Sequence, residues 1–289
     1  MTSAFSDILL HLGEFFELCQ DLSLYAEAET GRFGVYRSRI GQLNGEIDRL
    51  RAGESERLVY RKLAEDLRRY LVALAESQEV GGLLPFLRVC SPQELMPKIR
   101  ALLAGPELPS DEDQTSNQAR NIQFELWLAA TLWRVGIPVE LAEPDIRCKI
   151  GDTTVLFACK RLLSVKKLTR RINEATEQLQ RNLEASPERT AWGFIAISLS
   201  RVLGKTDQSE AIANRTDGLD RLASRIEVLV TRRARWQQTR EAQGVLFHLG
   251  SMFTNNETNR IESGHYVTLY GSGPVCEALA GKLHSGAAQ

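Results

Sequence analysis

The sequence predicts an α+β protein of two domains: an all-helical domain over residues 1–105 and a mixed α/β domain over residues 118–289. Through the first hundred residues, apolar side chains recur at three- and four-residue spacing, which is typical of amphipathic helices. After residue 118, helical stretches alternate with short runs of β-branched and apolar residues, the pattern of a sheet flanked by helices. The stretch between them, residues 106–117, is acidic and contains proline, so we expect a linker there.

The first domain is expected to contain four helices, at residues 2–30, 35–51, 55–77 and 91–104. Glycines at Gly31, Gly53 and the Gly81-Gly82 pair are expected to end the first three. Ser91, Pro92 and Glu94 have the arrangement of a helix start with a capping box. The sequence of this domain shows no grouping of catalytic residues. The domain is expected to be either a regulatory, oligomerisation or partner-docking module, or a plain bundle that packs on its neighbour.

In the second domain the expected order is a helix, a strand, a β-hairpin, a helix and a strand, followed by further helices and strands. The helices are expected at residues 118–135, 168–183, 219–238 and 274–283, the strands at 139–141, 192–200, 244–253 and 266–270, and a loop at 201–218. The order predicts a mixed sheet with helices on its faces.

The hairpin is centred on Gly151-Asp152, which separates two runs rich in β-branched and apolar residues. A turn there pairs Ile150 with Thr153 and, further out, Asp145 with Ala158. Directly opposed residues project on one face, and alternate residues share that face. One face is therefore expected to carry a carboxylate and the ammonium of Lys160. The other face, with Val155, Phe157 and Cys159, is expected to lie on the core.

This stretch resembles the PD-(D/E)XK nuclease superfamily. Pro144-Asp145 matches the first half of the motif, and Ala158-Cys159-Lys160 stands where the family has an acid, any residue and lysine. The resemblance covers residues 116–289 and implies a restriction-endonuclease-like fold and Mg²⁺- or Mn²⁺-dependent phosphodiester hydrolysis, with DNA favoured over RNA. It implies that Asp145 and Glu125 hold metal, that Lys160 positions the attacking water, and that Gln178 belongs to the site.

Ala158 departs from the family pattern. Either the chain is a natural degenerate member, or an acid was changed to alanine to stop catalysis. In both cases metal binding should be poor, because hard cations need several oxygen ligands. The alternative function is an inactive nuclease-like module that binds nucleic acid or a partner protein. The family further implies a role in antiviral defence, with a helicase or ATPase as partner subunit, and the helical domain could mediate homo-oligomers.

The net charge of −1 conceals an uneven distribution of charge. Residues 160–240 contain 17 Lys and Arg against 9 Asp and Glu. Such a local excess of positive charge favours a polyanionic partner, although solvated helix faces would look the same. The residues expected to contact nucleic acid are Arg161, Lys166, Lys167, Arg170, Arg171, Arg232, Arg233, Arg235 and Trp236.

Composition indicates the cellular compartment in which the protein is expected. No run approaches the ~20 apolar residues of a membrane span, and the start lacks the basic region of a signal peptide. The five cysteines are scattered, without CxxC spacing, which favours a reducing cytoplasm and argues against a thiolate zinc site.

Other chemistries have weaker support. Arg260 and His265 have the spacing of the HEPN-type ribonuclease motif, which in that family lies on a helix. His248 and His265 could act as a pair of general bases for nucleophilic catalysis, but no serine or cysteine on a nucleophile elbow accompanies them. Gly271 to Pro274 lacks the Lys-Ser/Thr of a phosphate-binding loop.

Overall fold

The structure, a computed structural model, describes residues 5–53, 55–113, 116–185, 191–204, 207–258 and 260–287. The chain divides into two compact units. Unit 1 comprises residues 1–123 with 206–209, and unit 2 comprises residues 124–205 with 210–289. The boundary falls inside helix α6 (Gln118–Arg134), after Gln123.

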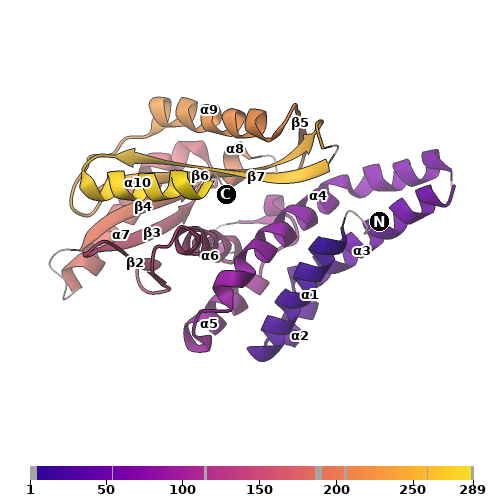
Figure 1. Ribbon diagram of the computed structural model, residues 1–289, viewed down its shortest axis with the longest axis horizontal. Coiled ribbons are helices and arrows are strands. Elements are labelled where there is room, and N and C mark those ends of the chain that lie inside the picture. The colour runs from indigo at the N-terminus through magenta and orange to yellow at the C-terminus, as the bar shows by residue number, and fades with distance from the viewer. Residues whose placement is uncertain are drawn as a thin grey trace. The chain divides into compact units, whose positions relative to one another are not determined.

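Unit 1 is helical. Its elements are α1 (Ser6–Asp21), α2 (Tyr25–Thr30), α3 (Arg32–Arg51), α4 (Glu56–Leu87), α5 (Pro92–Leu103) and the short 3₁₀ helix η1 (Pro109–Asp111). Helices α1, α3 and α4 pack against one another (Figure 1). Their core contains the aromatic rings of Phe15, Phe33 and Tyr36, which are fully buried. As the capping pattern predicted, the Ser91 hydroxyl accepts a hydrogen bond from the Glu94 amide at the start of α5.

Two helix ends in unit 1 differ from the prediction. The first predicted helix is two helices, α1 and α2, separated at Ser23, whose φ of 58° interrupts the α-helical backbone; its predicted start, at residues 2–4, lies outside the described residues. The prediction that Gly81-Gly82 ends a helix was wrong, because α4 continues through both. A Cβ at Gly81 would lie 2.9 Å from the His11 side chain, so this glycine permits close packing of α1 on α4.

The segment predicted as a linker packs on unit 1 as far as Asp113; Gln114 and Thr115 lie outside the described residues. Leu108 and Pro109 are buried. The carbonyl of Glu107 accepts hydrogen bonds from the Tyr36 hydroxyl at 2.7 Å and from Arg120 at 2.8 Å. These contacts attach the segment to the helical core.

Unit 2 contains the sheet. Its strands are β1 (Val139–Glu140), β2 (Ile146–Ile150), β3 (Thr153–Arg161), β4 (Trp192–Ser198), β5 (Ser209–Ile212), β6 (Gly244–Asn255) and β7 (Arg260–Gly271). Its helices, besides the rest of α6, are η2 (Val165–Lys167), α7 (Leu168–Ala185), α8 (Ser200–Leu203), α9 (Arg215–Arg233) and α10 (Pro274–Ala287). The prediction of a loop at residues 201–218 was wrong, since α8, β5 and the start of α9 lie there.

The described strands form a seven-stranded mixed sheet in the order β1-β2-β3-β4-β6-β5, with β7 also paired to β6. Strands β3, β4 and β6 are parallel, whereas the β2–β3 and β6–β7 pairs are antiparallel. The predicted hairpin register is confirmed from Ile150↔Thr153 to Ile146↔Phe157. Gly151 has a φ of 60°, as a two-residue turn with glycine at its first central position requires.

Helices cover both faces of the sheet (Figure 1). Helices α7 and α9 bury one face, and their apolar residues share a core with Leu156, Ala158 and Ile195. Helices α6 and α10 lie on the other face, where the Trp127 ring packs against His248 and α10 contacts β2 and β7. Strand β3 is therefore buried on both faces, and the prediction that only its Val155 face lies on the core was incomplete.

No helix in the described part of the chain is both long and apolar enough to cross a membrane.

Candidate functional site

The candidate site lies where β2 begins and β3 ends. The Oδ2 atom of Asp145 accepts a hydrogen bond from the backbone amide of Cys159 at 2.6 Å. The carboxylate therefore lies beside β3, next to Ala158, as the hairpin register predicted. Asp145 is held by the sheet itself, because its partner is a main-chain group of a central strand.

Lys160 and Gln178 complete this group. The ammonium of Lys160 donates to Oε1 of Gln178, and the amide nitrogen of Gln178 donates to the carbonyl oxygen of Pro144 at 3.1 Å. Gln178 thus joins the end of β3 to the residue preceding Asp145. The structure therefore brings Asp145, Lys160 and Gln178 together, from a loop, a strand and helix α7.

The side chains that surround residue 158 are apolar. Ala158 is fully buried in the core beneath α7 and α9, while Lys160, two residues on, is partly exposed. Glu125 is buried in α6.

The residues present do not fit a stable Mg²⁺ or Mn²⁺ site. Over the described residues, no group of three or more His, Cys, Asp or Glu side chains is arranged to hold a metal ion. Hard divalent cations prefer several oxygen ligands. Asp145 already accepts a short backbone hydrogen bond, and Ala158 supplies no ligand. The site therefore lacks at least one metal ligand, namely the acid that the resemblance leads one to expect at position 158.

The two predicted basic clusters lie next to each other. The hydroxyl of Thr169, in the first turn of α7, donates to the carbonyl oxygen of Arg233 near the end of α9 at 3.3 Å, and α9 also contacts η2. This contact brings Lys166 and Lys167 close to Arg232 and Arg233. We call the surface formed by these four residues the basic surface.

The cations near this surface differ in how far they are neutralised. Arg170 and Arg171 both pair with Glu174 at 2.7 Å. The four residues of the basic surface form no ion pair with any described residue. Their positive charge is therefore available to an external anion.

Arg161 and Trp236 do not lie as expected for contacts with nucleic acid. Arg161 is buried and pairs across the sheet with Ser198, on the face opposite to Lys160. Trp236 is partly buried and packs against the apolar core, which removes part of its ring from solvent. Arg235 follows α9 and is exposed, as expected. Alternation along β3 explains the burial of Arg161, since neighbours in a strand point to opposite faces.

A second polar cluster lies on that opposite face. Nε2 of His248 lies 3.0 Å from Nδ1 of His265, and Nδ1 of His248 lies 3.3 Å from the Ser198 hydroxyl. Burial lowers the pKa of His265 to about 4, helped by the charges of Arg134 and Arg215. Burial likewise lowers the pKa of His248 well below its ordinary value. Both rings are neutral at pH 7.

The sequence indicated the two histidines but not Ser198, which comes from β4 and meets His248 only through the parallel pairing of β4 and β6. Arg260 and His265 both lie on strand β7 and not on a helix, so they do not have the geometry of the HEPN-type motif.

Comparison with protein-family models, with curated proteins and with solved structures finds no significant match to this chain.

Proposed function

We propose that unit 2 is a nuclease-type module of the PD-(D/E)XK kind, which binds the phosphate backbone of nucleic acid, DNA before RNA. In this proposal Asp145, Lys160 and Gln178 form the hydrolytic site, and rapid hydrolysis depends on the acid that Ala158 replaces. The observation that carries the proposal is a set of three hydrogen bonds at the open end of the β2–β3 hairpin: Asp145 with the Cys159 amide, Lys160 with Gln178, and Gln178 with the carbonyl oxygen of Pro144.

The order of the elements supports this proposal. A helix, an antiparallel hairpin, a second helix and a parallel strand follow one another from α6 to β4. The aspartate comes just before β2, the lysine near the end of β3, and the glutamine on the next helix. This is the arrangement that the resemblance leads one to expect.

The basic surface supplies the binding part of the proposal. Its Lys and Arg side chains have no ionic partner among the described residues and lie on η2 and α9, beside the helix that carries Gln178. Contacts from such residues to phosphates give affinity without selecting a base sequence. Lys160, at the end of β3, would offset the charge that develops on a phosphate under attack.

The chain as it stands is therefore expected to bind nucleic acid and to cleave it slowly or not at all. The test is the Ala158→Glu variant, assayed with Mg²⁺ on DNA and RNA. We expect cleavage at least about 100-fold above that of the unaltered chain, since a positioned acid–base or metal-binding group contributes on this scale. Ala158→Gln, which has the same size without the charge, is the matched control and should remain inactive.

Ala158 is buried, so the folding of each variant is checked by circular dichroism and thermal unfolding, and the shorter Ala158→Asp is assayed as well. Adding Lys160→Met should abolish any gain. If folded Glu and Asp variants both leave DNA and RNA intact, the hydrolytic site is wrong. If the unaltered chain binds neither nucleic acid, the whole proposal is wrong.

A further inference from the structure

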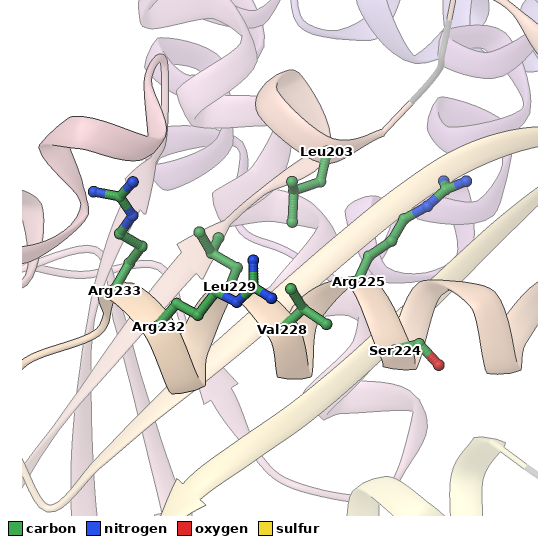
Figure 2. A pocket seen from close by; sticks show the side chains of 7 residues that line it. All are labelled: Leu203, Ser224, Arg225, Val228, Leu229, Arg232 and Arg233. Carbon is green, nitrogen blue, oxygen red and sulfur yellow. The ribbon is translucent and has the colours of Figure 1, made fainter.

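Beside the basic surface, unit 2 has an open pocket of about 450 Å³ (Figure 2). We call it the α9 pocket. Its lining comes from α9 and from Leu203 of α8, and the residues are Leu203, Ser224, Arg225, Val228, Leu229, Arg232 and Arg233. The volume is within the range of small-ligand sites, roughly 300–1,000 Å³.

The chemistry of the lining is unusual for a solvent-exposed helix face. Leu203, Val228 and Leu229 make an apolar floor, and Val228 is 52% exposed. The charged residues of the lining are all arginines, with no acid among them. Figure 2 shows Arg225 toward one end of the pocket and Arg233 toward the other, with Leu203 facing Val228 and Leu229. A ligand that fits has an apolar surface and negative charge at its edge.

The arginines are not equivalent. Arg225 is bound to Glu210, whereas Arg232 and Arg233 have no ionic partner among the described residues. An anionic group is therefore expected at the Arg232 and Arg233 end. That end adjoins η2 and the first turn of α7, where Thr169 contacts Arg233, so it is continuous with the basic surface.

We infer that the α9 pocket binds a single unpaired nucleotide, with its phosphate at Arg232 and Arg233 and its base against Val228 and Leu203. This inference rests on the proposed binding of nucleic acid. A paired and stacked base hides its flat faces inside a duplex and presents mainly its phosphate, whereas an unpaired base offers an apolar face to protein side chains. A pocket with Arg232 and Arg233 at one end and an exposed aliphatic floor is therefore expected to bind unpaired strands in preference to duplexes.

The test compares the affinities of a single-stranded oligonucleotide, a duplex of the same sequence and a free mononucleotide. Val228→Asn removes the apolar floor without changing charge, and it should weaken single-strand binding about three- to tenfold while duplex binding stays within about twofold. Ile261→Asn is the matched control, because Ile261 is another exposed aliphatic residue of unit 2, on β7. It should change neither affinity.

The double variant Arg232→Gln/Arg233→Gln should weaken both forms of nucleic acid, since both carry phosphate. If the free mononucleotide competes with the oligonucleotide, and Val228→Asn abolishes this competition, a free nucleotide is sufficient for binding to the α9 pocket. If only the oligonucleotide binds, the pocket requires a nucleotide within a strand. If Val228→Asn changes the affinities for single strand and duplex equally, or changes neither, the inference about the α9 pocket is wrong while the proposed function still stands. Absence of nucleic-acid binding by the unaltered chain would instead refute the proposed function, and the inference with it.

Discussion

At the scale of single residues, the candidate site depends on Gln178. Its side-chain amide binds the Lys160 ammonium through oxygen and the Pro144 carbonyl through nitrogen. An amide has both a donor and an acceptor, so one side chain can connect a cation to a carbonyl group. Gln178 thereby fixes the lysine relative to the loop that carries Asp145.

Gln178→Leu should destabilise unit 2 by about 1–3 kcal/mol, because it leaves a partly buried ammonium and a buried carbonyl group without partners. The measurement is urea unfolding. Gln180→Leu is the control: Gln180 lies on the same helix, is exposed and bonds only to Glu184, so the change should stay within about 0.5 kcal/mol. Equal losses in the two variants would contradict the structural role given to Gln178.

The histidine pair predicts a dependence of stability on pH. Burial lowers the pKa of His265 from 6.5 to about 4, so between these values the unfolded chain binds a proton that the folded chain does not. The contribution is complete above pH 6.5 and is lost as the pH falls toward 4. The expected loss is on the order of 2–3 kcal/mol.

Unfolding by urea at pH 7.5, 6 and 5 measures this effect, and Trp127, which contacts both rings, provides a fluorescence signal. His265→Gln should make the dependence shallower over that range, and His248, whose pKa is also lowered by burial, accounts for part of what remains. His284→Gln, at an exposed position of α10, should leave the dependence unchanged. An acid loss as steep in His265→Gln as in the unaltered chain would assign it to other groups.

At the scale of secondary-structure elements, unit 1 is connected through a buried ionic network. Glu76 of α4 lies 2.5 Å from Arg32 of α3 and 2.5 Å from Arg120 of α6. The Tyr36 hydroxyl oxygen lies 3.0 Å from the same carboxylate. Burial alone would lower the pKa of Arg120, but Glu76, Tyr36 and Glu112 together more than offset it and the net shift is upward. One carboxylate thus joins three helices of the bundle.

Glu76→Gln should cost unit 1 about 3–5 kcal/mol, because it leaves two buried guanidinium groups without their shared counter-charge. Thermal and urea unfolding measure the loss. The control is Glu29→Gln, which breaks the half-exposed pair with Arg37 and should cost far less, because solvent screens that pair. Similar losses for Glu76→Gln and Glu29→Gln would mean that burial of the network adds nothing.

At the scale of the whole molecule, charge is distributed unevenly over a nearly neutral chain. The net charge is −1, while residues 160–240 hold 17 basic against 9 acidic residues. Some of these cations are neutralised internally, as Arg221 is by Asp217 and Glu210. The four cations of the basic surface lie close together and have no ion pair with any described residue, so they should contribute strongly to long-range attraction to polyanions.

This predicts a measurable salt dependence. Each cation that contacts a phosphate contributes about 0.9 to the slope of log affinity against log salt for duplex DNA. Lys166→Gln and Arg232→Gln should therefore each lower the slope by about one and weaken binding uniformly across sequences. Lys149→Gln, an exposed lysine near the hairpin turn, is the control and should keep the slope. An unchanged slope in Lys166→Gln and Arg232→Gln would remove the basic surface from the interface.

Local pattern in the sequence predicted the β2–β3 register and, from it, that Asp145 lies beside the end of β3, because turn residues and strand alternation act over a few residues. Gln178 was expected only from the resemblance to the nuclease superfamily, and in the structure it bonds to Lys160. Packing across distant segments decided the rest. The neighbours of β3 bury Ala158 and Arg161 on opposite faces, a helix contact accommodates Gly81 without ending α4, and Ser198 meets His248 across two strands. Such contacts join residues far apart in the chain, and no short-range periodicity records them. The tertiary structure alone therefore determined which cations are buried, which are paired, and which are left to face a ligand.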